Sequence, residues 1–286
     1  MNDPRMDDAH EDARFPKGTM DDLTLRRVET LGEYHECVAI QEATWGPGFR
    51  ELVPTAILLV SQKLGGVCAG AFAPDGRMLG FVFGLTGVID GALAHWSDLL
   101  AVRAEARGAN LGERLKRYQR ELVREIGVRT MYWTFDPLVA RNAHLNLARL
   151  GARASRYVPD MYGDDTGSPL HGRLPTDRFV AAWDLDSDGP APLPDDDGVL
   201  VTPVDDAGRP TLGPLPDVPI VSVAVPHDFA ALTHDARAAW RAVTRAALVS
   251  YLDRGYEVIG FRRAAGSSDA LGTTTYPHYV LRASRR

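Results

Sequence analysis

The sequence has few of the features that mark several classes of protein. It holds only two cysteines, Cys37 and Cys68, which cannot make a disulfide framework or a zinc site unaided, and their apolar neighbours favour buried, reduced thiols. The N-terminus is acidic and lacks the apolar segment of a signal peptide. No run approaches the roughly 18 apolar residues of a membrane span. We therefore expect a cytoplasmic protein with no membrane partner and no metal site.

An excess of positive charge is also missing. The chain carries 32 lysines and arginines against 38 acidic residues, a net charge of −6. No block of basic residues accumulates in one segment, as a surface for a phosphate backbone would require, so no nucleic-acid partner is expected. With 286 residues, 45% of them hydrophobic, the chain is long enough for one large or two modest globular domains.

Composition divides the chain into four segments. Residues 1–22 are acidic and read as a tail, and residues 23–186 alternate short apolar strands with helices. Residues 187–219 are rich in proline and aspartate and predict a linker or an irregular crossing segment. Residues 220–286 predict a β-α-β-β unit. The expected strands are 23–28, 66–71, 78–86, 95–102, 130–135, 156–162, 179–185, 220–225, 256–262 and 276–281, and the expected helices are 33–45, 54–63, 111–126, 139–150 and 228–254.

The most informative stretch is the turn Arg107–Gly112, which joins a strand to a helix. Its small residues leave several backbone N–H groups unpaired, and the helix dipole adds partial positive charge, which together suit a pyrophosphate. The P-loop pattern and the dinucleotide pattern G-x-G-x-x-G both fail here. A tight turn without any ligand is the remaining alternative.

The pattern Val102-x-x-x-x-Arg107-Gly108-x-x-Leu111-Gly112 resembles the acyl-CoA signature of the GNAT superfamily. The order of elements from residue 23 to residue 185 also resembles the GNAT fold, an α/β (α+β) fold with a mixed central sheet flanked by helices. The segment Thr134 to Asn142, T-x-D-P-L-x-x-R-N, is similar to one subgroup of that superfamily. The resemblance implies an N-acyltransferase with acetyl-CoA or another acyl-CoA as co-substrate.

The resemblance also implies a cofactor site. The turn amides would hold the CoA pyrophosphate, and a backbone N–H near Leu100 to Val102 would polarise the thioester carbonyl. Asn142 would meet the pantetheine arm, with Asn146 one turn later on the same helix face. Alternatively, Asn142 satisfies the N-terminal amides of its own helix. The implied cofactor-binding residues are Leu100, Ala101, Val102, Arg107, Gly108, Ala109, Asn110, Leu111, Gly112, Asn142 and Asn146.

Attack of an amine on a thioester needs a base, a polarised carbonyl and a proton for the thiolate. Asp98 stands four residues before Val102, where relatives carry an acidic residue, so it is the candidate base. His95 competes because its pKa is near neutral. A structural pairing of Asp98 with an arginine is the alternative. Tyr157 and Tyr162, on one predicted strand, are candidate acids or ordinary half-buried strand tyrosines.

The acceptor is expected to be a primary amine of a small molecule such as an amino acid. Trp45 and Arg50 follow the first helix, in the region that shapes the acceptor pocket of relatives. Arg50 or Arg178 would bind an acceptor carboxylate, unless each is simply solvated. The acyl group is acetyl by default, and succinyl is also admissible.

Two departures from the GNAT pattern favour a non-catalytic acyl-CoA-binding module, either a sensor or a subunit. Asn110 replaces the central glycine of the turn, although asparagine adopts positive φ more readily than most residues. Leu147 replaces the tyrosine that many relatives use as the acid. A structural protein with an empty site is a third interpretation. The C-terminal unit would either cover the acceptor cleft or form a homodimer interface.

Overall fold

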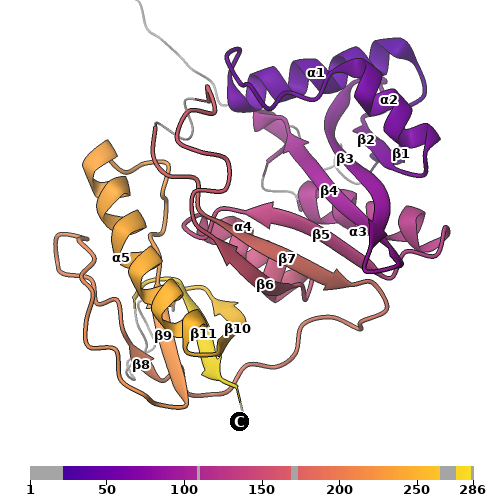
Figure 1. Cartoon of the computed structure of the whole chain (residues 1–286). Helices are drawn as coiled ribbons and strands as arrows, with labels where there is room; N and C mark the ends of the chain where they lie inside the picture. The colour runs from indigo at the N-terminus through magenta and orange to yellow at the C-terminus, as the bar shows by residue number, and fades with distance from the viewer. Residues whose placement is uncertain (1–21, 108–109, 169–172, 265–274, 285–286) are drawn as a thin grey trace, which may run out of the picture.

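The computed structural model describes residues 22–107, 110–168, 173–264 and 275–284, and its strands form two sheets (Figure 1). The first sheet has the order β1-β2-β3-β4-β5-β7-β6, and the second has the order β10-β11-β9-β8. The strands of the first sheet are β1 (Thr24–Arg27), β2 (Val67–Phe72), β3 (Met78–Ile89), β4 (Ala92–Val102), β5 (Thr130–Phe135), β6 (Arg153–Val158) and β7 (Arg178–Asp184). Those of the second are β8 (Val199–Leu200), β9 (Ile220–Ala224), β10 (Tyr256–Arg262) and β11 (His278–Ala283).

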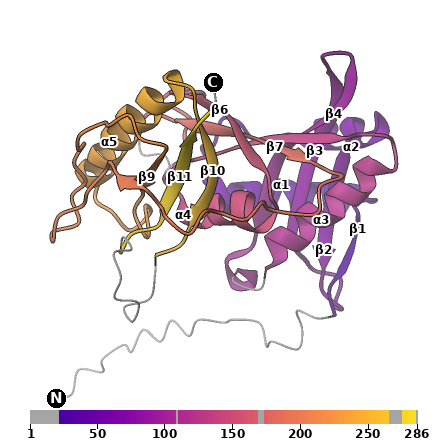
Figure 2. The same cartoon turned by 90° about the horizontal axis from the view of Figure 1, so that it is seen from below.

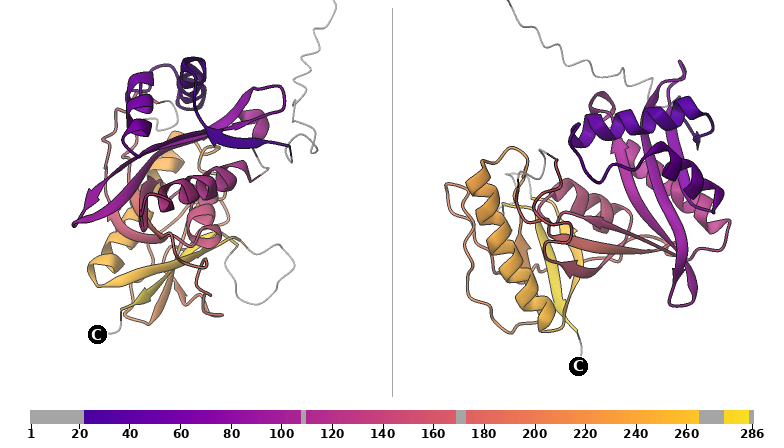
Figure 3. Two further views of the ribbon diagram at one scale, coloured as in Figure 1. Left: turned by 90° about the vertical axis from the view of Figure 1, so that its right-hand side faces the viewer. Right: turned by 45° about the horizontal axis from the view of Figure 1, so that its top comes forward.

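Helices cover both faces of the first sheet. The α-helices of the described ranges are α1 (Leu31–Trp45), α2 (Thr55–Lys63), α3 (Leu111–Arg124), α4 (Ala140–Ala143) and α5 (His234–Asp253). A capping box fixes the start of α1, because the Thr30 side chain accepts from the Glu33 amide and the Glu33 carboxylate accepts from the Thr30 amide. Figure 3 shows α1 and α2 on one face of β1–β4 and α3 on the opposite face.

The hairpin of β3 and β4 is longer than the sequence analysis predicted. The two strands are joined by Asp90 and Gly91, whose φ values are 51° and 78°. Positive φ at both central residues is the geometry of a two-residue hairpin turn, for which Asp-Gly is a preferred pair. This second Asp-Gly signal was missed, so the expected strands ended at residue 86 and began at residue 95.

The C-terminal unit has the predicted β-α-β-β order. Its helix α5 begins at His234 rather than Asp228, because the Thr233 hydroxyl accepts from the Ala236 amide and caps the helix there. The segment that was expected to be irregular contains β8, which pairs in parallel with β9. None of the helices in the described ranges is long and apolar enough to cross a bilayer.

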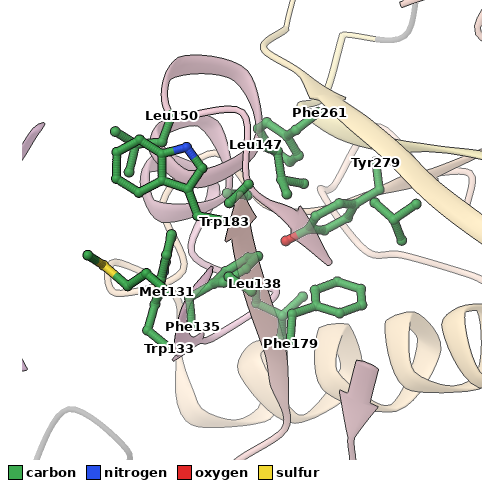
Figure 4. Close-up of a cluster of buried hydrophobic side chains, with 14 of the residues drawn as sticks. Met131, Trp133, Phe135, Leu138, Leu147, Leu150, Phe179, Trp183, Phe261 and Tyr279 are labelled. Atoms are coloured by element: carbon green, nitrogen blue, oxygen red, sulfur yellow. The ribbon is translucent and has the colours of Figure 1, made fainter. Parts of the chain in front are cut away.

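One hydrophobic core joins the two sheets. Phe261 of β10 and Tyr279 of β11 pack with Leu147 and Phe179 from the first sheet and its helices (Figure 4). The Tyr279 hydroxyl donates to the backbone carbonyl of Pro137 at 2.7 Å. Figure 2 shows the same arrangement from below, with β10 and β11 beside α4 and β6. The C-terminal unit therefore shares its interior with the β5–β7 half of the first sheet.

Candidate active site

The two central strands of the first sheet separate after a short contact. β4 and β5 are parallel and pair only at Ala94–Thr130, His95–Met131 and Trp96–Tyr132. Beyond Trp96, β4 continues to Val102 with β3 on its other side only. Alternate backbone N–H groups of this stretch point away from β3, because an antiparallel ladder uses only every second residue. The parting strands therefore present free amide groups to anything lying between them.

A β-bulge in β4 lies where the strands part. Leu99 is opposite Phe83, and Ser97 is opposite Gly84, so the intervening Asp98 has no partner on β3. An extra residue of this kind changes the face to which later side chains point. Consequently Leu99 packs in the core under α1 and α2, whereas Ser97 bonds to side chains of α3.

Asp98 lies on the α1–α2 side of the sheet, close to Glu51 in the loop between these helices. Asp98 as a whole is exposed to solvent, but neighbouring atoms limit the hydration of its carboxyl group. This partial desolvation disfavours the charged form and raises the pKa of Asp98. The negative charge of Glu51 raises the pKa further, and a hydrogen bond from the Trp96 side chain opposes the shift. No arginine or lysine of the described ranges forms an ion pair with Asp98. The geometry does not favour the structural arginine pairing considered above.

His95 lies on the opposite side of the sheet and is fully buried. Its Nε2 accepts from the Gln119 amide at 2.9 Å, and its Nδ1 donates to the Thr86 hydroxyl at 2.9 Å. Burial, together with the charge of Lys116, lowers the pKa of His95 to about 3. A neutral imidazole with both nitrogens occupied is poorly suited to take a proton from an acceptor on the other face.

The turn before α3 is described in part. Gly108 and Ala109 lie outside the described residues. Asn110 has φ 56° and ψ 17°, the left-handed conformation that the sequence analysis anticipated for this position. Arg107 is exposed, and its Nε donates to the Val102 carbonyl at 3.3 Å. α3 begins directly after Asn110, so the amides of its first turn face the end of β4.

The helix that carries the two candidate asparagines is irregular. α4 is α-helical only to Ala143, and residues 144–149 form a π-helical turn in which the Leu150 amide donates to the Leu145 carbonyl. The wider turn rotates the later side chains, so Asn142 is half-buried while Asn146 is buried. That the two asparagines share one face of the helix stays a prediction. Leu147, at the position of the missing tyrosine, is a core residue (Figure 4).

The two candidate tyrosines have different surroundings. The Tyr157 hydroxyl donates to Asp177, and burial with this bond raises the pKa of Tyr157. Tyr162 is not on β6 as predicted, because β6 ends at Val158 and Tyr162 lies in the following turn. Its hydroxyl is 3.1 Å from the Thr134 hydroxyl. Thr134 is on β5 beyond the last pair with β4, so Tyr162 lies beside the opening between the strands.

The three candidate acceptor-binding residues all have protein contacts. Trp45 stacks on Phe49 with ring centroids 5.4 Å apart. Arg50 pairs with Asp165 at 2.8 Å, an exposed contact that joins the α1–α2 loop to the β6–β7 loop. Arg178 is buried beside Asp136 at 3.5 Å. That Arg50 or Arg178 binds an acceptor carboxylate stays a prediction.

Several neighbours of the site were missed by the sequence analysis. Glu51 was overlooked because an exposed loop glutamate has no local signature. Asp136 at the end of β5 receives two hydrogen bonds from Arg241 of α5, at 2.9 and 2.6 Å, a contact that the sequence analysis did not anticipate. Asp177 likewise receives a bond from the Nε of Arg245 at 2.9 Å. Partners so far apart in the chain give no spacing that a sequence reader could recognise.

The order of elements along the chain, the mixed sheet with helices on both faces and the helix after the turn are those that the resemblance implied. Residues 24–184 have a GNAT fold. No protein-family profile matches the chain, and no curated protein matches it.

Solved structures with this GNAT fold were found at low sequence identity. One is a candidate acetyltransferase of Salmonella typhimurium with its cofactor acetyl-CoA, at 18% identity over 61% of this chain and 98% of that chain, with a TM-score of 0.46. Another is the ribosomal-protein-S18-alanine N-acetyltransferase of Escherichia coli, at 16% identity, 58% and 96% coverage and a TM-score of 0.45. A third is Naa50 of Arabidopsis thaliana with a bisubstrate analogue, at 12% identity, 56% and 97% coverage and a TM-score of 0.44. The likeness concerns the fold.

Proposed function

We propose that the chain is an N-acyltransferase that moves an acyl group, acetyl by default, from CoA to a primary amine of a small molecule. The observation that carries the proposal is the separation of β4 from β5 next to the bulged Asp98. Free backbone amides of β4 can bind the amide groups of pantetheine as an added strand would. The left-handed Asn110 and the first turn of α3 supply further amides for a pyrophosphate.

The proposed reaction uses a base, a backbone N–H group and a source of a proton for the leaving thiolate. Asp98 takes a proton from the acceptor ammonium, directly or through water, and the freed amine attacks the thioester carbonyl. A backbone N–H between Leu100 and Val102 polarises that carbonyl. The nitrogen of the tetrahedral intermediate gives its second proton to solvent and the C–S bond breaks. The thiolate receives a proton from Tyr162, which solvent then reprotonates, or directly from water, since a thiol has an ordinary pKa near 8.5.

Ligand binding is the first test of the proposal. CoA or acetyl-CoA at a hundredfold excess over its Kd should stabilise the folded protein by about 2.7 kcal/mol, measured as a thermal shift. Absence of a shift with any acyl-CoA at millimolar concentration would falsify the cofactor assignment. Mass spectrometry of the protein incubated with acyl-CoAs and a pool of amines then identifies the acceptor.

Turnover separates the enzyme from the non-catalytic alternative. Asp98→Asn keeps the shape of the side chain but removes its basicity, so kcat should fall by ~10²–10⁴ while CoA affinity hardly changes. His95→Gln should lose much less, because His95 lies on the other side of the sheet. The buried Leu147 and the engaged Tyr157 favour the sensor alternative. If the wild-type protein bound CoA but acylated no amine, the non-catalytic sensor would be the correct interpretation.

A further inference from the structure

Lys116 is a buried lysine for which the proposed chemistry has no role. The chain has three lysines, at positions 17, 63 and 116. Lys116 is only 3% exposed, and within the described ranges no carboxylate pairs with it. Its amine donates to the Ser97 hydroxyl at 2.6 Å and lies 4.0 Å from the centroid of the Trp133 ring. Burial lowers the pKa of Lys116 well below its ordinary value.

The amine occupies the point where the two central strands separate. Trp96 and Tyr132 are the last residues that pair between β4 and β5. Ser97 and Trp133 are the next residues on the two strands, and the Lys116 amine contacts both. The amine therefore lies on the α3 side of the sheet, at the point where β4 and β5 separate. In the proposed function, acyl-CoA would bind between the separated strands.

Lys116 begins a chain of hydrogen bonds in which every donor has one defined acceptor. Its amine donates to Ser97, the Ser97 hydroxyl donates to Gln119 Oε1 at 2.7 Å, and the Gln119 amide donates to His95 Nε2. The chain ends where His95 donates to Thr86, whose hydroxyl donates to a backbone carbonyl at 2.7 Å. Each member of this buried network has at least one hydrogen-bond partner, which restricts its side chain to one arrangement.

This network holds the residue next to Asp98. Ser97 belongs to the β-bulge, and both of its side-chain bonds fix it to α3. With Ser97 fixed on that side, the unpaired Asp98 points to the α1–α2 side, where Glu51 and Trp96 surround its carboxyl group. A bulge without such a fixed member could shift by one residue along the strand and exchange the faces of its side chains.

We propose that Lys116 is a positioning residue, which acts through Ser97 to fix the bulge of β4 and so holds Asp98 toward the acceptor side of the sheet. This inference rests on the proposed function in one respect only, the role of Asp98 as the base. Lys116 itself touches neither donor nor acceptor in this scheme. Its task is to keep the bulge and the parting of the strands in place.

The test compares Lys116→Met, Ser97→Ala and, as a matched control, Lys63→Met at the exposed lysine of α2. The first readout is the pKa of the Asp98 carboxyl, measured by carbon-13 NMR titration in each variant. Lys116→Met and Ser97→Ala should both move this pKa toward the ordinary value of an aspartate, because the carboxyl group leaves its shielded position. Lys63→Met should leave it unchanged. Methionine keeps the length of the side chain and suits a core, and Ser97→Ala gives a second test if one variant fails to fold.

The second readout is kinetic. Lys116→Met should lower kcat by about 10²-fold, as expected for a misplaced catalytic group, without changing the Kd of CoA, and should shift the acid limb of the pH–rate profile. Asp98→Asn should then cost much less in the Lys116→Met background than in the wild type. An unchanged Asp98 pKa in both variants would overturn the inference. If the wild type acylates no amine, the proposed function fails, and the NMR titration still decides the role of Lys116.

Discussion

The buried, neutral His95 predicts a specific pH dependence of stability. In the unfolded chain His95 has its ordinary pKa of 6.5, whereas in the folded protein its pKa is about 3. Between these values the unfolded state binds a proton that the folded state does not, so stability falls as the pH falls. Each pH unit in this range lowers the free energy of unfolding by about 1.4 kcal/mol. Lowering the pH from 6.5 to 4.5 should therefore remove about 2–3 kcal/mol of stability through His95 alone.

The variant that isolates this contribution is His95→Gln, because glutamine has similar hydrogen-bonding groups but does not titrate. Equilibrium urea unfolding at pH 6.5 and pH 4.5 gives the free energy of unfolding of each protein. The carboxylates titrate equally in both proteins, so their contributions cancel in the comparison, and the coupling of Lys116 to His95 is part of the difference that is measured. The wild type should lose about 2–3 kcal/mol more than the variant. If both proteins lost the same free energy of unfolding, water would reach His95 in the folded protein, and the pKa of His95 would not be lowered by burial.

Three further predictions follow from individual contacts. Asn110→Gly should tighten CoA binding or leave it unchanged in calorimetry, because glycine adopts positive φ freely, and a roughly tenfold loss would instead make Asn110 a direct ligand. Arg241→Met should lower the free energy of unfolding by about 3 kcal/mol, because the Asp136 carboxylate loses two hydrogen bonds and keeps only Arg178, at 3.5 Å, as an ion-pair partner within the described ranges, and adding Asp136→Asn should recover part of the loss in urea unfolding. Gly167→Ala should lower Tm more than Gly163→Ala. Both glycines have φ 71°, but only at Gly167 would an added Cβ meet the α1–α2 loop, 2.0 Å from a carbonyl oxygen. Equal shifts in Tm would show that the loop moves aside without a cost in stability.

Elements with strong local signals were predicted well. The limits of β5 and β10 agree with those expected from the sequence, because each is a short apolar strand bounded by a glycine or by a turn. The left-handed conformation of Asn110 was also anticipated, since few other residues tolerate it. The order of elements along the chain was read from the sequence pattern, whereas the order of the strands within the sheet was not predicted.

Which side chains of a helix or strand are buried was predicted less well, because burial depends on partners elsewhere in the chain. The predicted helix 111–126 extended to Ile126, yet α3 ends at Arg124 and Ile126 is 42% exposed, while Lys116 and Gln119 are buried. Periodicity cannot place a lysine in a core, because its burial requires polar partners from β4. Likewise, Arg241 and Asp136 are 105 residues apart, and no local pattern connects them.

The two faces of β4 explain why residue type alone did not identify the base. On the α3 side, burial lowers the pKa of His95 and holds the imidazole neutral among fixed partners. On the other side, partial shielding and a nearby carboxylate raise the pKa of Asp98, which makes it a stronger base than an ordinary aspartate. Histidine has the better intrinsic pKa for proton transfer near neutral pH, but its environment removes that advantage. The bulge between them sets the faces, so the choice of base follows from the register of one strand.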